Sequence, residues 1–348
     1  MTANREQKAD AKIGSSAKSR KGKDVGARGV FAAVLTPLDR RLEPDLGALK
    51  DHCAWLVANG CDGLAMLGTT GEANSLSVEQ RRRMLGSVAK AFPPATILPG
   101  VGSCALSDAA GLARIATEFG CAGVLVLPPF FYKDPTEEGL YEFYARLIER
   151  VNDARLRLYL YHFPQMSSVA IPVNLIVRLT DAFPGIVAGL KDSSGDWSYS
   201  RDLLKRLPGL GVFSGSEEFL LENLRAGGAG CISATVNVTA PVVARVVAAI
   251  GAAGLASPDA AACQAHATAA RQVLQRYPLV SSLKYLKARL AKDSGWERML
   301  PPLTALSAQQ RADLSADLWE VDDLLRKEHA LAQLFEGETP EAIRGSVA

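Results

Sequence analysis

The sequence of 348 residues has no apolar run long enough to cross a membrane and few of the residues that build metal sites. Its longest apolar stretches, such as 242–250, are interrupted by Arg245 and fall short of the roughly 20 residues that a bilayer requires. Four histidines and six scattered cysteines, with no Cys-x-x-Cys pair, argue against a zinc site. We therefore expect free thiols in a reducing cytoplasm, no membrane span and no bound metal.

The chain also lacks a strong excess of charge of either sign. Lys and Arg number 39 against 37 Asp and Glu, which gives a formal net charge of +2. The first 28 residues hold eight basic and three acidic side chains, so they carry +5 and the remainder carries −3. Residues 1–27 have few large apolar side chains and no apolar segment typical of a secretory signal. We predict a disordered basic tail over 1–27, a mildly acidic folded body and no nucleic-acid partner.

From Val30 onward the sequence repeats a short aliphatic or β-branched run, a turn and a helical period, the pattern of βα units in a parallel sheet. Eight strands are predicted, at 30–36, 63–68, 96–101, 123–128, 156–163, 186–192, 211–215 and 230–234. Helices are predicted after them, at 45–59, 77–91, 105–119, 136–152, 172–182, 197–207, 217–227 and 239–253. This order favours a (β/α)8 TIM barrel over 28–254, with an open doubly wound sheet as the alternative.

The C-terminal part of the sequence shows helical patterns and no further strand. Helices are predicted at 259–277, 281–293 and 308–331, with Pro-Pro-Leu at 301–303 as a break. We therefore expect a C-terminal helical region over 255–331 that caps the barrel or forms an oligomer contact, followed by a flexible tail over 332–348.

Reactive groups in a parallel barrel lie at the C-terminal ends of the strands, and Lys191 ends the sixth predicted strand. An amine is a nucleophile only when it is neutral, and burial among apolar side chains favours the neutral form. By itself the position also fits a lysine that extends to the rim of the barrel or pairs with Asp192. Lys191 is thus a candidate nucleophile.

Tyr161 and a threonine pair end two other predicted strands. Tyr159 and Tyr161 share one face of the fifth strand by alternation, but Tyr161 is nearer its end, where Pro164 stops it. A phenol beside a reacting carbonyl can carry protons, and the alternative is a core tyrosine with a local partner. After the second strand, Thr69 and Thr70 lie between glycines in GTTGE, which suits a carboxylate site or an ordinary helix cap.

These motifs occur together in the order and spacing of a known family. GTTGE at 68–72, YHFP at 161–164 and GLKDSSGD at 189–196 resemble the dihydrodipicolinate synthase and N-acetylneuraminate lyase family of class I, pyruvate-handling aldolases. GAGCISATVN at 228–237 and PPLTALS at 301–307 extend the resemblance, which covers about residues 28–325.

The resemblance implies a role for each matching position. Lys191 would form a Schiff base with the 2-oxo carbon of pyruvate or another 2-oxo acid, so no further cofactor is needed. Tyr161 would shuttle protons, Thr69 and Thr70 would hold the carboxylate, and the backbone at Ile232 would line the far side.

The resemblance also implies a homotetramer in which a neighbouring subunit's tyrosine often completes a hydroxyl relay. The corresponding string here is Pro129-Phe130-Phe131-Tyr132, with Phe131 at the usual relay position. The relay is therefore expected to be absent or shifted to Tyr132.

Two departures separate the chain from the best-known family members. Met166 stands where dihydrodipicolinate synthases carry an arginine that pairs with the carboxylate of aspartate semialdehyde, and a thioether makes no ion pair. Ala234 stands where sialic acid lyases carry a serine, although the acidic pair Glu217-Glu218 is shared with them.

Polar residues near the strand ends suit a hydroxylated aldehyde arm. The substrate-binding candidates are Gly215, Ser216, Glu217 and Gln165, with Ser167 and Ser193 as further hydroxyl-seeking groups. Glu217 could equally belong to an exposed helix start, where acidic residues are favoured.

We therefore predict a Schiff-base lyase that cleaves a 2-oxo-3-deoxy sugar acid, or a related 4-hydroxy-2-oxo acid, to pyruvate and an aldehyde. The alternatives within the family are 4-hydroxy-tetrahydrodipicolinate synthase and a 2-oxo-3-deoxy acid dehydratase or hydratase-aldolase. An alternative of another class is a barrel that binds such ligands without turnover.

Overall fold

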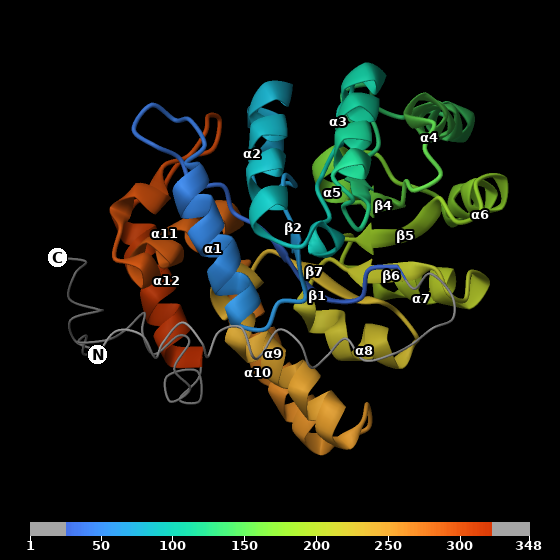
Figure 1. Cartoon of the computed structure of the whole chain (residues 1–348). Coiled ribbons are helices and arrows are strands. Elements are labelled where there is room, and N and C mark those ends of the chain that lie inside the picture. Colours follow the sequence, from blue (N-terminus) through green and yellow to red (C-terminus); the bar gives the residue numbers. More distant parts are fainter. Residues whose placement is uncertain (1–25, 322–348) are drawn as a thin grey trace, which may run out of the picture.

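Parallel strands lie at the centre of the molecule and helices surround them, as the computed structural model in Figure 1 shows. The structure describes residues 26–321. The predicted tails fall almost wholly outside this range, at 1–25 and 332–348. Gly26 and Ala27 are described, and the Ala27 N–H donates a hydrogen bond to the Tyr159 hydroxyl over 2.9 Å.

Seven strands form one parallel sheet in the order β2-β1-β7-β6-β5-β4-β3. They are β1 Gly29–Ala33, β2 Gly63–Ala65, β3 Val124–Val126, β4 Leu158–His162, β5 Val187–Asp192, β6 Gly211–Ser214 and β7 Gly230–Ser233. The order wraps round the barrel and leaves β2 and β3 at its two ends, so the predicted TIM-barrel fold is confirmed.

The predicted third strand at 96–101 occupies the remaining gap between β2 and β3 but is not a regular strand. Isolated parallel bridges join Leu64 to Ile97 and Gly100 to Leu125. A 3-10 turn over Pro94–Thr96 overlaps the start of this segment, and Pro99 lies within the segment. Because proline has no N–H to donate, the ladder is interrupted, and the count of eight regular strands was wrong by this one.

Large side chains fill the inside of the barrel below its C-terminal end. Phe31, Tyr159, Phe213 and Ile232 are almost completely buried there. A Cβ on Gly189 would lie 2.5 Å from the Tyr159 ring, so this glycine makes room for the ring. The interior is thus a packed floor, and a cavity can open only above it.

Eight helices follow the strand segments round the barrel. They are α1 Leu46–Ala58, α2 Val78–Ala91, α3 Leu106–Glu118, α4 Glu137–Val151, α6 Val173–Ala182, α7 Trp197–Arg206, α8 Leu220–Arg225 and α9 Val236–Ala253. The predicted capping box at Ser77 and Gln80 is present, and Gly60 and Gly120 follow helix ends at φ of 98° and 76°. The sequence missed a short helix, α5 Pro164–Ser167, directly after β4.

Three further helices, α10 Pro258–Leu274, α11 Leu279–Ala291 and α12 Ala308–Val321, make up the C-terminal region. Pro278 separates α10 from α11, since proline starts helices more readily than it continues them. Within the described residues, α9 alone is long and apolar enough to span a membrane. Its first half is buried, and the helix packs against β1, α10 and α11, as a core helix does.

Candidate active site

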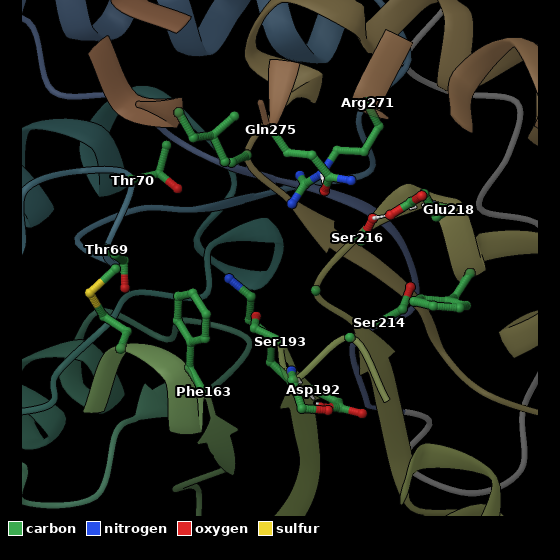
Figure 2. A pocket seen from close by; sticks show the side chains of 18 of the residues that line it. Thr69, Thr70, Phe163, Asp192, Ser193, Ser214, Ser216, Glu218, Arg271 and Gln275 are labelled. Carbon is green, nitrogen blue, oxygen red and sulfur yellow. Dashed lines mark hydrogen bonds between the residues drawn. The ribbon is translucent and has the colours of Figure 1, made fainter. Parts of the chain in front are cut away.

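A cavity of about 480 Å³ opens at the C-terminal end of the barrel. The ends of β4, β5 and β6 and the loop after β2 form its floor and sides, and α10 and α11 add residues from the C-terminal region. Figure 2 shows Thr69, Thr70 and Phe163 on one side, Ser214, Ser216 and Glu218 on the other, and Arg271 and Gln275 pointing in between them. The predicted placement of reactive groups at strand ends thus matches the position of the cavity.

Lys191 lines this cavity from β5 and is only 5% exposed. Its Nζ lies 4.4 Å from the centroid of the Tyr161 ring, which is its register partner on β4. Asp192, the next residue, lies at the edge of the cavity, and its carboxylate accepts hydrogen bonds from the Ser194 N–H and the Ser200 hydroxyl. Within residues 26–321, no hydrogen bond or ion pair holds Nζ, so Lys191 neither pairs with Asp192 nor extends into solvent.

Tyr161 lies beside Lys191 and is also buried. Its hydroxyl is 3.3 Å from the Thr69 hydroxyl, and either oxygen can be the donor. Tyr159 lies two residues earlier on the same face, in the packed floor of the barrel. Height along the strand therefore distinguishes the two tyrosines, as the sequence suggested.

The loop after β2 presents unused donors to the cavity. Thr69 and Thr70 both line it, and within the described chain neither backbone N–H donates to another protein group. Leu67 and Glu72 flank the pair with φ of 59° and 56°, a left-handed conformation that non-glycine residues rarely adopt. Two N–H groups and two hydroxyls at one turn can bind a carboxylate.

A buried ion pair holds this loop in place. Glu72 pairs with Lys284 of α11, and both side chains are fully buried. The Leu300 N–H donates to the second Glu72 oxygen over 2.7 Å, and Lys284 Nζ donates to the Arg298 carbonyl over 2.7 Å. Burial lowers the pKa of Lys284, while Glu72 opposes this shift. Lys284 therefore has a structural role and does not line the cavity.

Gly215 and Ser216 line the cavity as predicted, at the start of the segment after β6. A Cβ on Gly215 would lie 2.1 Å from the Ser193 hydroxyl and 2.7 Å from the Asp192 carbonyl, so only glycine fits against the end of β5. The Ser216 hydroxyl lies 3.2 Å from a Glu218 carboxylate oxygen, and Glu218 lines the cavity as well.

Glu217 does not line the cavity, although the sequence placed it there. Its side chain is completely buried, accepts hydrogen bonds from the Ser233 and Thr235 hydroxyls, and lies 3.7 Å from Arg271 Nη1. The alternative of an exposed helix start is also wrong. The 3-10 turn Glu217–Phe219 rotates this side chain inward and Glu218 toward the cavity.

Three other predicted positions lie away from the cavity wall. Gln165, on α5, donates to the Ser194 carbonyl over 2.5 Å. The Ile232 side chain is buried within the barrel, and Ala234, two residues later, lines the cavity in its place. Tyr132 is 79% exposed and packs against Phe131. Among the described residues of one copy of the chain, a possible hydroxyl relay therefore consists of Thr69 and Tyr161.

Several cavity residues were not found from the sequence. Phe163, Trp197 and Phe219 add aromatic surface, and Arg271 and Gln275 extend from α10. The spacing of Arg271 and Gln275, four residues apart, places them on one helix face, but nothing in the sequence connects that face to the barrel mouth.

Comparison with known proteins agrees with this geometry. Residues 26–321 match the model of the dihydrodipicolinate synthetase family. A DapA-like lyase of Chloroflexus aurantiacus is 34% identical over 296 residues, which cover 83% of this chain and 95% of that protein. A 4-hydroxy-tetrahydrodipicolinate synthase of Thiobacillus denitrificans is 35% identical over 215 residues, 61% of this chain and 70% of that protein.

Solved structures show the same architecture. The dihydrodipicolinate synthase of Agrobacterium tumefaciens superposes with a TM-score of 0.76 at 29% identity, covering 84% of this chain and 99% of that one. A variant of the 2-keto-3-deoxygluconate aldolase of Sulfolobus solfataricus shares the fold, with a TM-score of 0.76 at 22% identity over 86% of this chain and 98% of that one.

Proposed function

The chain belongs to the dihydrodipicolinate synthetase family, and from this we propose that Lys191 forms a Schiff base with the 2-oxo carbon of a 2-oxo acid. The observation that carries the proposal is the environment of its amine. Lys191 is buried and lines the cavity, its Nζ lies 4.4 Å from the ring centre of Tyr161, and among the described residues it has no hydrogen-bond or ion-pair partner. Two other buried lysines serve the structure, since Lys284 pairs with Glu72 and Lys287 packs against tryptophan rings. Of the three, Lys191 is the one that lines the cavity, which fits a nucleophile.

The proposed reaction is the cleavage of a 4-hydroxy-2-oxo acid. The neutral Nζ replaces the 2-oxo oxygen, which takes the Tyr161 proton and leaves as water, and an iminium ion forms. The Tyr161 oxygen anion then takes the proton of the 4-hydroxyl group, the C3–C4 bond breaks, an aldehyde leaves, and the electron pair passes to the iminium to form an enamine. Tyr161 gives this proton to C3, and hydrolysis of the resulting iminium releases pyruvate and the neutral lysine and returns a proton to Tyr161. Donors on Thr69 and Thr70 hold the carboxylate throughout.

A 2-oxo-3-deoxy sugar acid is one substrate of this kind. Of the polar residues that suggested it, Ser193 and Ser216 line the cavity, whereas Gln165 and Glu217 do not. Ser167 is also turned away, because its hydroxyl donates to the Phe163 and Val169 carbonyls. Support for a hydroxylated arm therefore comes from two serines.

The names of several relatives favour a second candidate, 4-hydroxy-tetrahydrodipicolinate synthase. That reaction requires recognition of a second carboxylate. Met166 lines the cavity where the resemblance implies an arginine, so this candidate has weaker support from the side chains present. A dehydratase would begin with the same Schiff base, and a non-catalytic barrel would form it without releasing product.

The proposal includes no metal or other cofactor, because the iminium formed on the lysine accepts the electron pair. It also includes a homotetramer in the cytoplasm, the assembly that the family resemblance implies. Phe131 and Tyr132, with 71% and 79% of their surface exposed, offer an apolar contact for a second copy.

Borohydride trapping tests the proposal. Reduction of the enzyme in the presence of pyruvate should add a pyruvyl-derived mass to the peptide that contains Lys191, and EDTA should not prevent it. Lys191→Met should abolish the label, whereas Lys284→Met, wherever the variant folds, should retain it. A label on Lys284, or no label on the wild-type enzyme, would exclude the mechanism.

A further inference from the structure

The part of the cavity beyond Lys191 has a largely apolar wall. Six side chains from five separate segments form it: Phe163, Met166, Trp197, Phe219, Leu279 and Leu303. The rings of Trp197 and Phe219 stack with their planes 12° apart and their centroids 6.1 Å apart. Met166 and Leu303 are 58% and 39% exposed, a high exposure for apolar side chains. This surface remains open to a ligand, because no described residue covers it.

Most polar side chains in the same wall are already satisfied within the protein. The Ser200 hydroxyl donates to Asp192, the Ser281 hydroxyl donates to the Thr304 carbonyl, and the Ser216 hydroxyl is bonded to Glu218. Each of these serines has used its single donor hydrogen, so it can accept from a substrate hydroxyl but cannot donate to one without breaking an existing bond. The wall therefore offers few free donors to a polyhydroxylated arm.

The charges of the wall do not favour an anionic arm either. Two cationic side chains, Lys191 and Arg271, line the cavity together with three acidic ones, Asp192, Asp196 and Glu218. Arg271 also lies 3.7 Å from the buried carboxylate of Glu217, which compensates its charge. After the pyruvyl carboxylate is bound at Thr69 and Thr70, no excess of positive charge remains for a second anion.

The cavity is also larger than pyruvate requires. Its 480 Å³ would hold roughly 16 water molecules at about 30 Å³ each, whereas pyruvate has only six heavy atoms. A planar ring could lie against the Trp197–Phe219 pair, since aromatic rings favour offset-stacked or edge-on contacts at such distances.

We infer that the aldehyde half of the substrate is neutral and aromatic, and that Trp197 and Phe219 determine this specificity. The inference depends on the proposed Schiff-base function and specifies its substrate class. In the synthetic direction, C3 of the lysine-bound enamine attacks the aldehyde carbon, and the aldehyde oxygen takes a proton. Water then hydrolyses the iminium and releases a 4-hydroxy-2-oxo acid with an aryl group at C4.

The test compares aldehydes as partners for pyruvate. Pyruvate consumption is measured with benzaldehyde, D-glyceraldehyde, succinic semialdehyde and acetaldehyde, which represent an aromatic, a hydroxylated, an anionic and a minimal arm. We expect kcat/KM for benzaldehyde to exceed that for glyceraldehyde and for succinic semialdehyde by at least tenfold, because only benzaldehyde buries its arm without leaving polar groups unpaired.

Variants then test the two rings. Trp197→Ser and Phe219→Ser should each lower the ratio of kcat/KM for benzaldehyde to that for acetaldehyde at least tenfold, and Trp197→Phe should restore part of the ratio. Tyr141→Ser is the matched control, because Tyr141 is a half-buried ring on α4 outside the cavity. Pyruvate trapping at Lys191 shows which variants retain an intact site. The ratio of kcat/KM values is then interpreted only for variants that trap pyruvate.

The outcomes separate the two proposals. Wild-type enzyme that traps pyruvate but prefers glyceraldehyde or succinic semialdehyde, or does not use benzaldehyde, overturns the aromatic specificity and leaves the Schiff-base function standing. An unchanged benzaldehyde ratio in both serine variants overturns the role of the rings. Wild-type enzyme that does not trap pyruvate removes the proposed function itself.

Discussion

Lys191 and Asp192 are neighbours in the sequence but have opposite surroundings. Alternation along β5 turns the lysine into the barrel mouth, whereas the Asp192 carboxylate, at the edge of the cavity, is bonded to Ser194 and Ser200. The same alternation places Tyr161 next to the amine and Tyr159 in the floor below it. The lysine amine is therefore left without a hydrogen bond in the described structure, whereas the aspartate carboxylate is tied to the fold.

Tyr161→Phe removes the phenolic oxygen while it keeps the ring beside Lys191. We expect turnover to fall by about 10² to 10⁴, the usual range for loss of a general acid–base. Borohydride trapping of pyruvate on Lys191 should remain detectable, since the amine and the threonine donors are unchanged. Steady-state kinetics and peptide mass spectrometry measure the two effects. A turnover within twofold of the wild type would remove Tyr161 from the proton path.

At the scale of elements, the loop after β2 depends on a helix more than 200 residues later in the chain. Glu72 is joined to Lys284 of α11 and to the Leu300 N–H, so the C-terminal region fixes the turn that carries Thr69 and Thr70. The left-handed conformation of Glu72 is held by these contacts. The C-terminal helices thus complete the site and do more than cover the barrel.

Substitutions at Glu72 and Lys284 should have strongly non-additive effects on the free energy of unfolding. Lys284→Met leaves the Glu72 carboxylate buried without its cation, which typically costs about 3–5 kcal/mol of unfolding free energy. Glu72→Gln combined with Lys284→Met should cost less than the sum of the single changes by more than about 1 kcal/mol. Urea unfolding of the wild type and the three variants measures this. Additive effects would show that the two side chains act independently.

At the scale of the whole molecule, a buried cluster outside the cavity wall limits stability. Lys287 of α11 lies 4.8 Å from the centroid of the Trp55 ring and 5.5 Å from that of Trp296. Burial lowers its pKa to about 8, and within the described residues no carboxylate pairs with it. Nearby, burial lowers the pKa of His52 to about 3, with Lys287 adding to the shift. Both groups resist protonation in the folded state.

Lys287→Met should therefore stabilise the protein by an amount that depends on pH. Between pH 8 and 10.5 the unfolded lysine binds more protons than the folded one, so wild-type stability rises with pH across this window. Below pH 8 the cost of the buried ammonium is fully present, and the variant should gain on the order of 2 kcal/mol. Denaturant unfolding at pH 7 and pH 10 measures the difference.

Lys50→Met, an exposed change on the neighbouring helix α1, is the control and should alter stability by less than about 0.5 kcal/mol. A gain from Lys287→Met that persists unchanged at pH 10 would assign the effect to packing and not to the charge.

The sequence by itself determined the repeating βα units, the C-terminal helices and the strand ends that carry Lys191, Tyr161 and the threonine pair. These features depend on local rules: alternation within a strand, helical periodicity, and turn residues at the ends. The strand expected at 96–101 was misjudged because proline interrupts its ladder, which only its bonding to β2 and β3 reveals.

The tertiary structure alone decided which loop residues face the cavity. Gln165 and Glu217 lie after their strands, where no period fixes the direction of a side chain, and both turn to protein partners. Trp197, Phe219 and Arg271 come from distant parts of the chain. Only the packing of α7, the 3-10 turn before α8, and α10 around the barrel mouth brings them together. The nucleophile is encoded locally, whereas the wall that selects its substrate is assembled by long-range contacts.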